Sequence, residues 1–492
     1  MKDYLKQFDT TAEYNTYING TPDLPNVSLT LDDNEVHYNK YVDYSREYLT
    51  FEALESGTFT LTVPTSVTSS YMTSVSYSTD DGANWVTTMI DNTAQTITTP
   101  TINAGDKVLW KGIGINASNN SYYSYSIFSS TGDFNVSGNI MSFFYGDNFV
   151  GQTDFPSRNQ GYFFYRMFYG CIDLISAANL ILPATTLATY CYSGMFQGCT
   201  SLTTAPELPA TTLSVRCYQE MFQGCTSLTT APELPATTLA QTCYFSMFKG
   251  CTSLTTAPEL PATTLASGCY SSMFSGCTAI TSVPSNYLPV TTLAQSCYSG
   301  MFKDCRALTT APELPATTLA DYCYREMLKN TRITTLPELP ATTLAQSCYR
   351  EMFTGCTAIT SVPSNYLPVT TLANSCYYSM FQDCRALTTA PELPATTLTS
   401  ECYSSMFNGC TSLTTAPELP ATTLANYCYQ SMFYGCRNIN SITMLATDIS
   451  ATNCLFNWVN GVAATGTFTK AASATIPTGL NGIPSGWTVV DA

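Results

Sequence analysis

Seven glutamates occupy the same place in successive copies of a repeated sequence, each within the tetrapeptide Pro-Glu-Leu-Pro. If neighbouring copies stack as strands, these carboxylates lie about 4.8 Å apart, where like charges repel unless cations or hydroxyls offset them. Two interpretations stay open: a row that binds cations or sugars, and a solvated row that deters edge-to-edge pairing. The members are Glu207, Glu233, Glu259, Glu313, Glu338, Glu392 and Glu418.

Catalysis is not expected from this set of carboxylates. A glycosidase needs two carboxyl groups in different environments at a fixed separation, and identical repeated carboxylates do not divide into an acid and a base. The one histidine, His37, precedes the repeats, so no Ser-His-Asp or Cys-His arrangement can be assembled within them. We therefore predict a protein that is not an enzyme and uses no cofactor.

Cysteine is the other residue type with chemical potential, at 21 residues. The Cys-x7-Cys spacing has no histidine beside it, which argues against zinc and predicts no metal site. The number is odd, the positions follow the repeat, and Thr331 replaces one of them, which argues against a compulsory disulfide there. We interpret the cysteines as reduced, buried, small apolar residues.

The elements that carry these residues repeat every 26 positions, as Cys191, Cys217, Cys243 and Cys269 show. A fixed period of this size predicts a solenoid, in which each copy buries its apolar face against its neighbours. Two copies, containing the sequence PSNYLPVTTLA at 284–294 and 363–373, are 28 residues long. The spacing of these two copies indicates that a block of three repeats was duplicated.

Each copy has two halves. In the copy at 243–251, Cys243 and Met247 are four residues apart, which predicts a short helix ending at Gly250. The other half, LTTAPELPATTLA, contains two prolines that exclude a helix, and its threonines favour a strand. We expect parallel strands of successive copies to stack, with the helices on the other side.

Two smaller regions precede the repeats. Alternating apolar residues predict strands at 49–54, 58–63, 74–78, 85–89, 96–98 and 107–112, with a hairpin at Asp81-Gly82 and core positions for Trp85 and Trp110. Residues 1–48 predict a short helix near Tyr4 and a strand pair around 32–34. The predicted organisation is an anchoring segment (1–48), a small β-sandwich (49–135), a solenoid (136–454) and a C-terminal cap (455–492).

The repeat resembles the BspA-type leucine-rich repeat. The matching residues of one copy are Cys225 and Leu228, the Leu-Pro pair at 234–235, and Met-Phe-x-Gly-Cys at 247–251. The resemblance implies a right-handed solenoid used for adhesion to protein or glycan at bacterial surfaces. The whole arrangement, with the ending GTFTKAAS…IPSGWTVV, also resembles fibre or tail-associated virion proteins of phages of gut bacteria.

Composition restricts the partners. Charged residues make up 11% and the net charge is −16, so nucleic acid and anionic membranes are not expected to bind. No run of 18 apolar residues occurs and the first residues lack the apolar core of an export signal, which predicts folding in a cytoplasm and no membrane insertion.

These observations predict a fold that is mainly β with short helices, namely a right-handed leucine-rich-repeat solenoid after a small β-sandwich and an anchoring segment. The resemblance to phage proteins implies a structural protein of a phage virion that is assembled in host cytoplasm. We expect it to form homo-oligomers, to attach to other virion proteins through its N-terminal segment, and to adhere to host-surface glycan or protein. A bacterial surface adhesin and a capsid decoration protein without a receptor are the alternatives.

Overall fold

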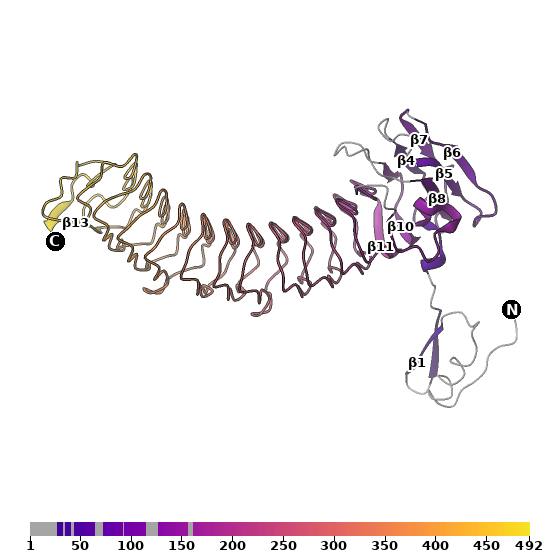
Figure 1. Ribbon diagram of the computed structural model, residues 1–492, viewed down its shortest axis with the longest axis horizontal. Helices are drawn as coiled ribbons and strands as arrows, with labels where there is room; N and C mark the ends of the chain where they lie inside the picture. Colours follow the sequence, from indigo (N-terminus) through magenta and orange to yellow (C-terminus); the bar gives the residue numbers. More distant parts are fainter. Residues whose placement is uncertain are drawn as a thin grey trace.

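The computed structural model describes residues 27–32, 35–40, 44–63, 72–91, 93–114, 126–155 and 161–492. Within these ranges the structure is mainly β, with fourteen strands, one α-helix and two 3-10 helices. Figure 1 shows a group of strands at one end and a long, curved array of coils, each formed by one copy of the repeat. The helix predicted near Tyr4 lies outside the described residues.

Two sheets precede the array. The first has the order β11-β10-β3-β8-β5-β6, in which β11 (Leu174–Ile181) already belongs to the first coil of the array. The second has the order β7-β4-β9. All six strands predicted between 49 and 112 form, within two residues at each end. Their bounds are Leu49–Ala53 (β3), Phe59–Val63 (β4), Met72–Ser78 (β5), Val86–Met89 (β6), Gln95–Thr98 (β7) and Lys107–Gly114 (β8), followed by Ile127–Ser130 (β9) and Phe134–Asn139 (β10).

The remaining N-terminal elements are short. Strands β1 (Val27–Asp32) and β2 (Glu35–Lys40) pair antiparallel, as the strand pair predicted around 32–34 requires, and His37 lies opposite Thr30. The 3-10 helix η1 (Tyr44–Arg46) leads into β3, while α2 (Ser142–Tyr145) and η2 (Gly146–Asn148) follow β10.

An aromatic cluster joins the two sheets and continues into the coils. The ring centroids of Phe51 on β3 and Phe128 on β9 are 4.8 Å apart, and Phe168 of the first coil lies 5.9 Å and 5.8 Å from them. Strand β10 also pairs in parallel with β11 (Leu174–Ile181) of that coil. The boundary predicted between 135 and 136 therefore falls inside β10, because the sheet and core run on into the repeats.

The two predicted core tryptophans differ. Trp110 is fully buried against Phe51 and Phe128. Trp85 is only partly buried, and Lys111 Nζ lies 4.0 Å from its ring centroid. The core position predicted for Trp85 is wrong, because the residue precedes the edge strand β6, whose side chains are mostly exposed.

The predicted helix in each repeat is wrong, and a ribbon of turns takes its place. In one coil Thr242, Ser246 and Gly250 have φ values of 51°, 52° and 76°, in the left-handed region that no right-handed helix uses. Between them, Met247 N donates to Tyr244 O (3.2 Å) within the coil. Each short bond spans three residues, so the segment is a run of tight turns.

Alternate amides of this ribbon bind the next coil. Tyr244 N donates to Cys269 O (3.1 Å), and Phe248 N donates to Met273 O (2.9 Å). Thr242, Ser246 and Gly250 make the equivalent bonds to 267, 271 and 275, which gives five bonds between two coils. The coils are therefore locked by a hydrogen-bonded ladder that a helix could not supply, because a helix uses its own carbonyls.

The Pro-Glu-Leu-Pro half is extended, yet it forms few strands. Neighbouring coils meet there through isolated bridges such as Thr204↔Thr230 and Thr230↔Thr256, so the predicted stack of regular strands is wrong for the middle coils. Prolines lack the amide hydrogen that a ladder needs. Regular parallel strands occur at the ends, where this motif is absent, as β11 and as β12 (Ser441–Met444), β13 (Thr467–Lys470) and β14 (Thr488–Asp491).

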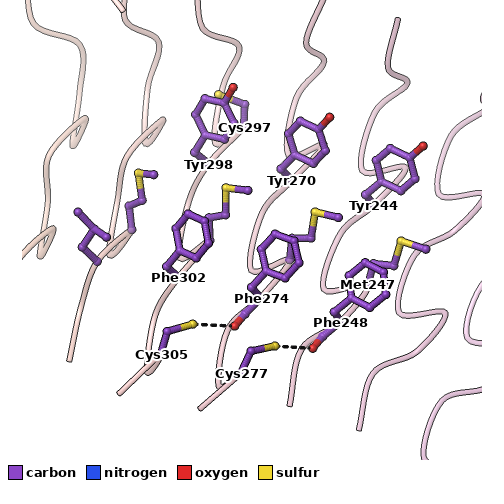
Figure 2. Packing of buried hydrophobic residues seen from close by; sticks show 14 of the residues in the cluster. Tyr244, Met247, Phe248, Tyr270, Phe274, Cys277, Cys297, Tyr298, Phe302 and Cys305 are labelled. Carbon is purple, nitrogen blue, oxygen red and sulfur yellow. Dashed lines mark hydrogen bonds between the residues drawn. The ribbon is translucent and has the colours of Figure 1, made fainter. Parts of the chain in front are cut away.

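Buried side chains stack in columns along the array. Figure 2 shows Tyr244 beside Tyr270 and, in a second row, Phe248 beside Phe274. The centroid distances within these two pairs are 5.8 Å and 5.7 Å, and the rings are nearly parallel. The phenylalanine column is interrupted by Leu328 and ends on Trp458, whose Nε1 donates to Gly482 O at 2.8 Å. Residues of the C-terminal segment thus cover the last coil.

Tyr218→Phe is expected to leave the free energy of unfolding unchanged or to raise it by about 1 kcal/mol. The Tyr218 hydroxyl is buried without a hydrogen-bond partner among the described residues, and Phe164 already occupies the first place of the tyrosine column. Tyr218→Ala should instead cost about 3–5 kcal/mol through the cavity it leaves. Urea unfolding measures the free energy of unfolding of both variants. If Tyr218→Phe lowers it by more than about 1 kcal/mol, the hydroxyl has a hydrogen-bond partner.

Candidate functional site

The predicted glutamate row exists as an exposed edge of the array. All seven side chains are exposed, each within the extended Pro-Glu-Leu-Pro segment of its coil. Within the described ranges, no group of three or more His, Cys, Asp or Glu residues is close enough to hold a metal ion. The cation-binding or sugar-binding role of this row stays a prediction.

Two bulges interrupt the row, and the extra residues of the 28-residue copies form them. In the first bulge, Tyr287 Oη donates to Pro258 O of the preceding coil, and Glu313 N of the following coil donates to Ser285 O, both at 2.8 Å. The second bulge repeats both bonds, with Tyr366 to Pro337 and Glu392 to Ser364, at the same distances. Each bulge therefore ties three coils together and takes the place of one carboxylate.

All 21 cysteines are buried free thiols. In one of the two cysteine columns the thiol donates to a carbonyl of the preceding coil, as Cys277 Sγ does to Phe248 O at 3.0 Å (Figure 2). Burial raises the pKa of the Cys251 thiol to about 12. Thiols held neutral and out of solvent are poor nucleophiles, and these buried side chains pack the core.

A run of ion pairs crosses three coils on the turn ribbon. Lys303 Nζ lies 2.5 Å from a carboxylate oxygen of Glu326, and Lys329 Nζ lies 2.6 Å from one of Glu351. The guanidinium groups of Arg325 and Arg350 contact the same two carboxylates from within their own coils, at 3.0 Å and 3.3 Å. Sequence inspection missed these pairs, because their partners lie 22 or 23 residues apart.

Glu326→Gln is expected to lower the free energy of unfolding by about 1 kcal/mol at pH 7. Burial alone would raise the pKa of Glu326, but the hydrogen bond and charge of Lys303, with the charges of Lys329 and Arg325, outweigh it and hold this pKa below its ordinary 4.5. A lowered folded-state pKa stabilises the fold above the unfolded pKa, and this stabilisation disappears as pH falls through the folded value.

The difference between wild type and Glu326→Gln should therefore be present at pH 7 and vanish in the acid range below 4.5. Thermal unfolding across this range is the measurement. Glu313→Gln, at an exposed member of the glutamate row, is the matched control and should change stability by no more than about 0.5 kcal/mol. A Glu326→Gln effect that persists in acid would exclude the ion pairs as its cause.

A second polar cluster lies beside the N-terminal sheets. Asp147 accepts from Tyr48 Oη (2.8 Å) and Lys111 Nζ (2.7 Å), and the lysine also lies over the Trp85 ring. Burial, together with the hydrogen bond and charge of Asp147, raises the pKa of Tyr48 to about 12. The tyrosine stays protonated and holds the loop of η2 against the sheet, which is a structural role.

Coils that are hydrogen-bonded to their neighbours and expose the same residues in each copy define a repeat protein with a regular exposed face. The family described as "BspA type leucine-rich repeat region (6 copies)" matches residues 140–281, 189–331, 241–388 and 317–461. These matches cover more than half of the sequence, so the chain belongs to the BspA-type leucine-rich repeat family. Membership indicates a surface or adhesion-type repeat protein.

The wider comparisons add no further relative: no curated protein and no solved structure matches this chain. Among the described residues, no helix is both long enough and apolar enough to cross a membrane.

Proposed function

We propose that this chain is a structural protein of a phage virion, in a head or tail fibre or appendage, whose repeats adhere to glycan or protein on the host surface. Family membership supports an adhesive role. The reduced, buried cysteines are compatible with assembly in a host cytoplasm. The assignment to a virion is supported by the resemblance of the domain arrangement and C-terminal sequence to phage fibre proteins.

The observation that carries the adhesive role is the recurrence of exposed residues from coil to coil. Thr229, Thr230 and Glu233 are exposed in one coil, and the same residue types are exposed at 255, 256 and 259 in the next. Each copy offers an equivalent weak contact, and many such contacts on one chain raise avidity without a strong single site.

The regions then have separate tasks. Residues 1–48 attach the chain to other virion proteins, and residues 49–135 form a small β-sandwich that spaces the repeats from the particle. The repeats of 136–454 form a right-handed solenoid that projects toward the host, and residues 455–492 cap it. Several chains assemble into one fibre, which multiplies the avidity again. No cofactor and no catalytic step are involved.

A bacterial surface adhesin is the second candidate, because family membership alone supports it equally well. Mass spectrometry and immunogold labelling of purified phage particles and of bacterial envelopes from the source culture separate the two. The chain is expected at a projecting appendage of the particles. Its presence only on bacterial envelopes would contradict the virion proposal and favour the adhesin.

A further inference from the structure

A groove of about 460 Å³ opens between two coils beside the first bulge, lined by residues 263–265 and 289–294. Its size falls within the range of about 300–1,000 Å³ that is usual for small-molecule sites. The groove coincides with a departure from the regular repeat, because Pro289 and Val290 belong to the first 28-residue copy.

The sequence of the bulged coil explains the opening. Ordinary coils carry an alanine before the second Thr-Thr pair, and Ala236 and Ala262 are only 1% and 3% exposed. The bulged coil carries Val290 at this place, and the larger side chain is only partly buried. A valine is too large for the space that a buried alanine fills in ordinary coils, and the groove lies beside this valine.

A second groove of the same construction is expected three coils further on. The sequence PSNYLPVTTLA recurs at 363–373, Val369 is also partly buried, and both bulges are anchored by the same two hydrogen bonds. The neighbouring coils supply the same Thr-Thr-Leu sequence, at 263–265 and 342–344. The shared sequence and the shared anchoring bonds are the reason to expect this second groove.

The lining determines what such a groove accepts. It contains four exposed threonines, at 263, 264, 291 and 292, together with leucine, valine, proline and alanine, and no charged residue. Threonine offers a hydroxyl that both donates and accepts and a methyl that packs on C–H surfaces. This combination suits an uncharged ligand that carries hydroxyl groups on an apolar ring.

From this chemistry and the duplication, we infer that the two bulged coils carry equivalent binding sites for a neutral polysaccharide. A polymer of repeated sugars can occupy both grooves of one chain at once, which converts two weak contacts into one stronger attachment. The inference rests on the proposed adhesive function in its glycan form, and it names both the ligand class and the residues that meet it.

The test is the number of short neutral oligosaccharides bound per full-length chain, measured by calorimetry with fragments of dextran, mannan and galactan. Thr291→Trp fills the first groove and Thr370→Trp the second. Thr237→Trp and Thr422→Trp are matched controls, because these exposed threonines accept the same pair of backbone bonds as Thr291 but follow the buried alanines Ala236 and Ala421.

Wild type and the double control, which carries Thr237→Trp and Thr422→Trp, are expected to bind two fragments per chain. Each single groove variant is expected to bind one fragment, and the double groove variant, which carries Thr291→Trp and Thr370→Trp, is expected to bind none. Equal binding by wild type and the double groove variant would overturn the groove assignment while leaving glycan adhesion intact. Binding of polygalacturonate alone, an anionic polymer, would overturn the neutral class. If no neutral fragment binds any variant, the inference fails, whereas labelling of virions still decides the proposed function.

Discussion

A chain that lacks residues 226–251 is expected to fold and to unfold at nearly the same temperature as the wild type. The deletion joins Cys225 to Thr252 and removes one complete coil, so the ribbon bond from Phe222 N, which reaches Met247 O, finds Met273 O in the same register. In an array where coils contact only their neighbours, stability falls by the contribution of one coil and one interface.

Deletion of only residues 226–238 is the matched control. It removes half a coil, so the turn ribbon of one copy meets the extended half of the next, and the columns of Tyr218 and Phe222 lose their partners. Circular dichroism and thermal unfolding are the measurements. Collapse of the whole-coil deletion to the level of the half-coil deletion would contradict independent stacking of the coils.

Phe248→Ala is expected to cost about 3–5 kcal/mol of unfolding free energy. The Phe248 ring is fully buried between Phe222 and Phe274, with centroid distances of 5.6 Å and 5.7 Å. A cavity here interrupts the core between two coils, so the array should split into two units that unfold separately. Urea unfolding and protease cleavage near this coil measure both effects.

Phe248→Leu is the control, because Leu328 occupies this column naturally and is fully buried. We expect this variant to lose less than about 1.5 kcal/mol of unfolding free energy and to unfold in a single cooperative transition. If Phe248→Ala lowers stability no more than Phe248→Leu does, the stacked ring column does not hold neighbouring coils together.

The repeat, its period and the buried cysteines could all be predicted, because apolar and cysteine positions return at a fixed interval. The turn ribbon could not be predicted from apolar spacing. In a helix, Cys243 and Met247 would lie on the same face because they are four residues apart. The ribbon of turns has a positive φ at every fourth residue, so it also returns to the same face after four residues. Both structures therefore produce the same spacing of apolar residues. A usable signal was present: the last left-handed position holds Gly, Asp or Asn, as at Gly250, Asp304 and Asn330, which are the residues that favour this conformation.

The candidate surfaces were predictable to different degrees. The glutamate row followed directly from repeat register, and all its members are exposed. The ion pairs from Lys303 to Glu351 depend on which side chains of neighbouring coils meet across the ribbon. The groove lies beside Val290, which stands where ordinary coils have a buried alanine. The space left by such a replacement follows from packing, which a pattern of residue types does not contain.

The measurement that tests adhesion most directly is the labelling of bacterial cells by the purified, fluorescent full-length chain. Cells from the source community are mixed with the chain, sorted by fluorescence and identified by sequencing. We predict that a narrow set of bacteria is labelled at the cell surface and that unlabelled chain competes for the same sites. If no population is labelled while the chain is present on phage particles, the repeats decorate the virion without a receptor, which contradicts the adhesive function.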